Sequence, residues 1–133
     1  MIIFAHLYKK MNDSIEILEQ YLENLSEEQK KYFLKIHYFL LDIFPFKVKI
    51  RYEIPFYDDN SWICYLNLIK NIGFELCFVD GNLLSNEQNI LESRGRKRIS
   101  GIILKNNEKI PEQKIIEIIH EALLLSKNKV KKS

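Results

Sequence analysis

The highest density of positive charge in the sequence lies in residues 94–98, where four cations surround one glycine. Guanidinium groups pair bidentately with oxyanions, and glycine lets backbone N–H groups approach a bound anion. The segment can therefore hold a phosphate or a carboxylate. The alternative is a solvated basic loop that pairs with nearby acidic side chains. The four candidate anion-binding residues are Arg94, Arg96, Lys97 and Arg98.

The two cysteines are a second candidate for chemistry. If a two-residue loop at positions 70–71 joins two strands, Cys64 lies opposite Cys77, with Cβ atoms about 5 Å apart. Such neighbours can share a metal or be oxidised, or they can be two small buried hydrophobic side chains. A shift of one residue in the register would place them on opposite faces. We exclude structural zinc, because it needs about four ligands and no CxxC pair or histidine cluster supplies the others.

Histidine and serine give no catalytic pattern. His37 and His120 lie within expected helices, where we expect surface positions, and neither has a second metal ligand at the i+4 spacing. His6 lies in the N-terminal arm. An enzyme would need a pocket that joins residues 94–98 to an acid or a nucleophile, and no such pair is visible. The serines of the ordered body occupy caps or turns without a strand–elbow–helix context: Ser26, Ser61 and Ser85.

Length and composition indicate one globular domain. The chain has 133 residues, of which 47% are hydrophobic, and this is enough to bury one core. The net charge of +2 is too small for the strong positive field of most nucleic-acid-binding proteins. No apolar run approaches the roughly 20 residues that span a bilayer, and no cleavable signal is visible. We therefore expect a cytoplasmic protein without nucleic-acid or membrane partners.

The N-terminal residues look separate from the domain. We expect residues 1–11 to form an arm, and the true start is either Met1 or Met11, because Met11 is a plausible second start codon. The arm is either a short apolar extension or a segment that docks in the core. Asp13 is the expected cap of the first helix, and the single domain covers residues 12–133.

Two helices come before any strand. Residues 14–25 have apolar side chains at helical spacing. Ser26 and Gln29 then form a capping box that begins a second helix, and Pro45 ends it. Its expected buried stripe is Tyr32, Phe33, Ile36, Phe39, Leu40 and Ile43.

Three strands are predicted next, at residues 47–52, 62–69 and 73–79. Pro55 indicates a strand end at an edge or a bulge, and residues 58–60 form a turn. Because these strands are apolar at both parities, both faces of the sheet need cover. The expected aromatic cluster of the sheet is Tyr52, Phe56, Trp62, Tyr65, Phe74 and Phe78.

The remaining elements complete an α+β fold. Residues 85–92 can form a short helix capped by Ser85, and a strand is expected over residues 99–104. A long C-terminal helix opens at Ile110-Pro111 and packs on the sheet. The predicted fold class is thus two N-terminal helices, an antiparallel meander of about four strands and one long C-terminal helix.

This order of elements resembles the YdhG-like family, a domain of unknown function found in small bacterial cytosolic proteins that includes a frataxin-like intracellular iron chaperone. The resemblance covers approximately residues 14–127. The family usually has glycine at the position of Glu53. The residues that carry the likeness are Tyr52-Glu53-Ile54-Pro55-Phe56, the strand of residues 62–67, Ile72-Gly73-Phe74, Arg96-Lys97 and Ile110-Pro111.

The resemblance implies a frataxin-like layout, with helices on one face of an antiparallel sheet, and a possible role in iron handling. Hard cations bind carboxylate oxygens, and the candidate metal ligands here are Glu53, Asp58 and Asp59, which converge if the Pro55 turn folds them together. The alternative for Asp58 and Asp59 is ordinary turn chemistry.

We therefore expect a non-enzymatic protein that handles a small ligand or a metal ion such as iron. The alternative is a protein-interaction or homodimerisation module that uses the apolar face of the sheet.

Overall fold

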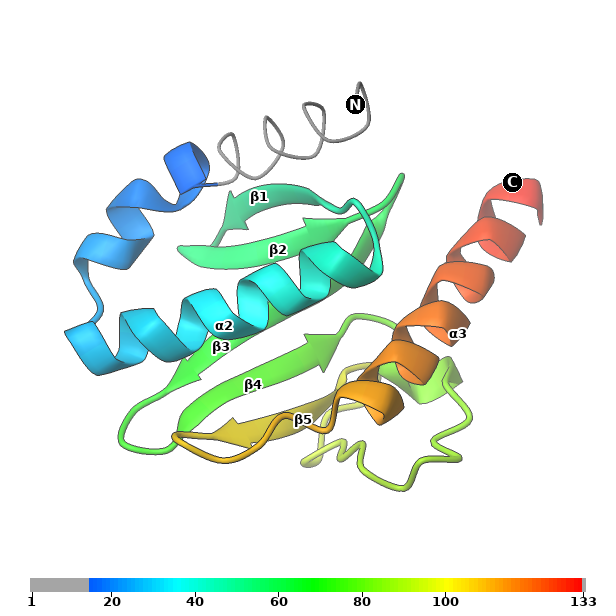
Figure 1. Ribbon diagram of the computed structural model, residues 1–133. Helices are drawn as coiled ribbons and strands as arrows, with labels where there is room; N and C mark the ends of the chain where they lie inside the picture. The colour runs from blue at the N-terminus through cyan, green and yellow to red at the C-terminus, as the bar shows by residue number, and fades with distance from the viewer. Residues whose placement is uncertain (1–14, 133) are drawn as a thin grey trace.

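The computed structural model describes residues 15–132, so the predicted arm, the cap Asp13 and His6 lie outside the described residues. Residues 15–23 are helical and are followed by α2 (Glu27–Ile43). The chain then builds a five-stranded sheet and ends in α3 (Glu112–Lys132) (Figure 1). The fold is α+β, in the predicted order of elements. No helix in this part of the chain is long and apolar enough to cross a membrane.

Both ends of α2 follow their sequence signals. The Ser26 hydroxyl accepts a hydrogen bond from the Gln29 backbone N–H at 3.1 Å, and the Ser26 N–H donates to the Gln29 side chain at 2.9 Å. This is the predicted capping box. At the other end Phe44 is extended, as the residue before a proline must be, so the helix ends at Ile43.

The sheet is an antiparallel meander with the strand order β1-β2-β3-β4-β5. Its strands are β1 (Lys47–Arg51), β2 (Ile54–Asp58), β3 (Trp62–Ile69), β4 (Gly73–Phe78) and β5 (Ser100–Lys105). The sequence predicted about four strands, and the further strand is β2, whose residues were interpreted as a strand end and a turn.

Strand β2 forms despite Pro55, and the position of this proline in the sheet explains why. Pro55 pairs with Ile50 of β1, whereas the β2–β3 register begins one residue later, at Phe56 opposite Tyr65. The turn before β2 consists of Tyr52 and Glu53, with φ of 53° and 63°. Two positive φ values in a two-residue hairpin turn normally require Asn-Gly or similar pairs, so Tyr-Glu gave no turn signal.

The predicted pairing of the two thiols was also wrong. The loop between β3 and β4 has three residues rather than two, because Ile69 lies opposite Gly73. Cys64 therefore lies opposite Phe78, and Tyr65 opposite Cys77. The register shift of one residue sends the two thiols to opposite faces of the sheet. Asn71, with φ of 66°, supplies the left-handed residue that such a loop needs.

Both long helices cover the same face of the sheet (Figure 1). We call this the helix-covered face, and the other the second face. The core between helices and sheet includes Phe33 and Ile36 of α2 and Ile118 of α3, all nearly inaccessible to solvent. The predicted packing of the C-terminal helix on the sheet is thus confirmed. His37, which we expected at the helix surface, is buried there instead, whereas His120 is exposed.

Residues 85–92 do not form the predicted helix capped by Ser85. Asn86 and Asn89 have φ of 55° and 58°, and the Asn86 side chain bonds both the N–H and the C=O of Leu91. These local side-chain bonds compete with helical ones. The segment is a loop after the short 3-10 helix η1 (Gly81–Leu83). It contacts α3 through two hydrogen-bonded pairs, Ser85 with Glu121 and Gln88 with Glu117.

Candidate ligand-binding groove

A buried ion cluster covers the second face over β4 and β5. Glu75 is 1% exposed, and its carboxylate accepts hydrogen bonds from Arg96 at 2.6 Å and from Arg94 at 3.0 Å. Burial alone would raise the pKa of Glu75, but the hydrogen bonds from Arg96 and Cys77 and the two arginine charges outweigh it and lower the pKa. A Cβ atom at Gly101 would lie 2.5 Å from this carboxylate, so glycine makes the room for it.

The predicted anion-binding segment is therefore divided. Arg94 and Arg96 come together, but they surround a carboxylate of the protein itself. Arg98 turns away and donates to Asp80 at 2.6 Å, while Lys97 is exposed. The four cations do not converge on one point, because the second face places two different acidic partners beside the same turn.

The part of the second face over β1 to β3 is covered by no described helix, and it carries aromatic side chains. Phe56 and Tyr65 stack with centroids 4.9 Å apart, and Trp62 meets Phe56 edge-on at 5.2 Å. Tyr52 lies beside Phe56 at 6.4 Å. These four residues line a depression of about 770 Å³, which we call the aromatic groove. It extends toward the C-terminal part of α3, where Ser126 and Lys129 also line it.

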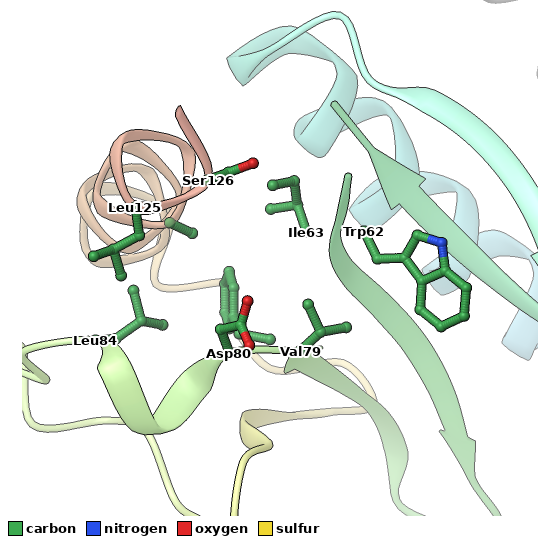
Figure 2. A pocket seen from close by; sticks show the side chains of 9 residues that line it. Trp62, Ile63, Val79, Asp80, Leu84, Leu125 and Ser126 are labelled. Atoms are coloured by element: carbon green, nitrogen blue, oxygen red, sulfur yellow. The ribbon is translucent and has the colours of Figure 1, made fainter. Parts of the chain in front are cut away.

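A β-bulge explains why Trp62 lies on this face. Tyr57 pairs with Cys64 but Asp58 pairs with Trp62, so Ile63 is an extra residue on β3. The bulge directs Ile63 into the core and Trp62 to the second face. Figure 2 shows this division: Ile63 points toward α3, and Trp62 points away from it. The side chains in Figure 2 line a small cavity of about 20 Å³, which has room for about one water molecule.

An internally neutralised arginine, Arg51, lies beside the aromatic side chains at one end of the groove. The Arg51 guanidinium lies 4.3 Å from the Trp62 ring centroid and 5.2 Å from that of Phe56, as in cation–π contacts. It also donates two hydrogen bonds to the buried carboxylate of Asp58, at 2.9 and 2.6 Å. The hydrogen bonds to Asp58 raise the pKa of Arg51 further. This pairing fixes the position of the Trp62 ring.

The other end carries an excess of positive charge. Asp80 accepts one hydrogen bond from Arg98 at 2.6 Å and one from Lys129 at 2.8 Å. Burial would raise the pKa of Asp80, but the bonds from Lys129 and Arg98 hold it below its ordinary value. Two cations therefore share one carboxylate, and both cations are more than half exposed, Arg98 at 69% and Lys129 at 55%.

The three candidate metal ligands do not come together. Glu53 lies in the turn before β2 and Asp58 at the far end of that strand, five residues or about 16 Å away in extended chain. The expected convergence fails because Pro55 is part of the extended strand and does not make a turn. Across residues 15–132, no group of three or more His, Cys, Asp or Glu side chains is placed to hold a metal ion.

The expected aromatic cluster is divided between the two faces. Tyr52, Phe56, Trp62 and Tyr65 line the groove, whereas Phe74 and Phe78 lie in the core under the helices. Sequence reasoning missed Lys129 as a groove residue and Arg51 as the neighbour of the Trp62 ring. The alternation of cations in residues 47–51 was a signal for Arg51, because it places that side chain opposite the apolar core. Lys129 is distant in the sequence and gave no signal.

Comparison with known proteins supports the fold. No protein-family model matches the sequence, and no curated protein matches it significantly. The structure is similar to the crystal structure of a DUF1801-family protein, YdhG, from Bacillus subtilis, with a TM-score of 0.65. The match has 13% sequence identity and covers 83% of this chain and 90% of the other. At this identity the likeness establishes a shared fold.

Proposed function

We propose that the protein binds a small organic ligand in the aromatic groove and catalyses no reaction there. The observation that carries this proposal is a concave, aromatic-lined part of a sheet face with no described helix over it. Its volume of about 770 Å³ lies in the range of small-molecule sites, about 300–1,000 Å³. The mixture of aromatic walls with a few charged groups is also typical of such sites.

The floor of the groove is organised in advance. Phe56 is buried beneath Tyr52, Trp62 and Tyr65, and the Arg51–Asp58 pair holds the Trp62 ring from one side. A rigid aromatic surface loses little conformational entropy when a flat molecule stacks on it. Trp62 is still 43% exposed and Tyr52 79% exposed, so both rings are accessible to a ligand.

The polar groups of the groove favour binding over catalysis. Asp58 and Asp80 are both engaged in ion pairs, and Ser61 and Ser126 bond to each other. Among the described residues that line the groove there is no histidine and no cysteine. The proposed ligand is organic rather than metallic because the described carboxylates do not converge.

The test is a screen of flat aromatic fragments, followed by amide and indole NMR shifts. Trp62 is the sole tryptophan, so its indole N–H signal is unambiguous. We expect binders that shift this signal and the amides of Phe56 and Tyr65. Trp62→Ala should weaken binding about tenfold, because stacking on an aromatic side chain contributes about 1–3 kcal/mol.

Leu124→Ala is the matched control, because Leu124 is an exposed apolar residue on α3 that does not line the groove. It should leave affinity unchanged. Fragments that shift no groove signal, or that bind Trp62→Ala as well as the unaltered protein, would refute the proposal. A dimer in sedimentation experiments, with the indole N–H protected from solvent, would assign the groove to a second copy of the chain instead.

A further inference from the structure

We propose that the ligand of the aromatic groove is a flat aromatic anion whose acidic group lies between Arg98 and Lys129. This inference rests on the proposed function and specifies the chemical class of the ligand. The groove is aromatic along β2 and β3, and its two ends differ in charge. A molecule that matches both features has an aromatic body and one negatively charged end.

The Arg51 end is unsuited to an acidic group. Its guanidinium is paired bidentately with Asp58 at 2.9 and 2.6 Å and stacks on Trp62. The side chain is 22% exposed and that of Asp58 is 8% exposed, so the charge is neutralised within the protein. An anion placed there would have to compete with a carboxylate that the fold holds in position.

At the Asp80 end, Arg98 and Lys129 carry more hydrogen-bond donors than Asp80 accepts. A guanidinium carries five N–H donors and an ammonium three, whereas Asp80 accepts one bond from Arg98 and one from Lys129. Two positive charges against one negative charge leave a net charge of +1 at this end. Both side chains already point to a common carboxylate, so an incoming oxyanion needs no large rearrangement to bind both. Charge-assisted bonds to carboxylate or phosphate are among the strongest hydrogen bonds in proteins.

The direct test compares ligands of one shape and different charge. The probes are 2-naphthoate, 2-naphthyl phosphate, the neutral 2-naphthamide and the cationic 2-naphthylmethylamine, measured by calorimetry and by groove NMR shifts. We expect the two anions to bind about tenfold more tightly than the amide, and the amine most weakly. The ratio between the two anions identifies which oxyanion the site prefers. Salt at about 1 M should reduce the advantage of the anions, since it screens exposed charges.

Two substitutions should move the charge preference in opposite directions. Lys129→Gln should reduce the preference for 2-naphthoate over 2-naphthamide severalfold. Asp80→Asn removes the competing carboxylate and should increase it, a gain that damage to the fold cannot produce. Lys127→Gln is the matched control: it removes the same charge from an exposed position on α3 outside the groove, and it should change nothing.

The outcomes separate this inference from the proposed function. If anion, amide and amine bind in the groove with equal affinity, the charge inference is overturned and the aromatic site stands. If Lys127→Gln weakens anion binding as much as Lys129→Gln does, the anion is attracted by the general charge of the helix, which also overturns the inference. If no probe binds at millimolar concentration, the proposed function fails as well.

Discussion

At the residue scale, the buried pair of His37 and Tyr57 shows how the core depends on protonation. His37 Nδ1 and Tyr57 Oη are 2.7 Å apart, and both side chains are fully buried between α2 and the sheet. Burial lowers the pKa of His37 to about 4 and raises the pKa of Tyr57. The imidazole is therefore neutral in the folded protein at every pH above about 4.

This pKa shift predicts acid-dependent stability. The unfolded chain takes up a proton at His37 near its ordinary pKa of 6.5, but the folded chain does so only near 4. The contribution of His37 to the free energy of unfolding is complete above pH 6.5 and is lost as the pH falls toward 4. This contribution is at most about 3 kcal/mol. Urea unfolding at pH 7 and 4.5 measures the loss. Carboxylates add their own acid dependence, so the difference between variants is the relevant quantity.

His37→Gln should lose less stability than the unaltered protein over this pH interval, because glutamine does not titrate. His120→Gln is the control, since His120 is exposed on α3. Identical pH dependence in the unaltered protein and in His37→Gln would show that His37 is not the responsible group.

At the element scale, the hairpin between β1 and β2 stores backbone strain beside the groove. Tyr52 and Glu53 both have positive φ, a conformation that costs a residue with a side chain about 1–2 kcal/mol. For a bulky residue such as tyrosine this is unusual. The strained turn places Tyr52 at the rim of the groove, next to Phe56.

Glu53→Gly should stabilise the protein by about 0.5–1 kcal/mol. Glycine adopts φ of 63° without a steric penalty, and this gain exceeds its larger loss of entropy on folding. The free energy of unfolding in urea measures it. Lys70→Gly, in the next hairpin loop at a position without positive φ, should lower stability instead. A destabilised Glu53→Gly variant would contradict the strain argument.

At the scale of the whole molecule, the two thiols lie on opposite faces of the sheet and can serve as probes of each face. Cys64 lies among core residues under the helices, and Cys77 lies beside Glu75 and Arg96 on the second face; both are fully buried. Burial raises the pKa of Cys77 to about 11 and that of Cys64 further. Neither thiol is available as a thiolate in the native protein, and the sheet separates them.

Thiol labelling should therefore follow unfolding. We expect Cys64 and Cys77 to react with a thiol reagent only as fast as the protein opens, and to form no disulfide with each other under oxidation. Ser93→Cys introduces an exposed thiol for comparison and should react at once. Rapid labelling of either natural cysteine under native conditions would show that its face of the sheet opens locally.

Much of the fold was predictable because its signals are local. The capping box at Ser26, the stop before Pro45 and the apolar periodicity of the two long helices each depend on residues within a few positions of one another. The candidate site was predictable only in part. Alternation in the strands indicated an aromatic sheet, but the bulge at Ile63 decided that Trp62 shares a face with Phe56.

The sequence by itself determined the two long helices and that the strands are apolar on both sides, because side-chain periodicity and capping act over a few residues. Only the tertiary structure decided which face remains open, since α2 and α3 both pack on one side and Glu75 draws Arg94 and Arg96 over part of the other. The tertiary structure also decided which residue lies opposite Cys64 and that Asp80 forms an ion pair with Lys129. Contacts between residues far apart in the chain depend on the assembled sheet, so no local sequence pattern predicts them.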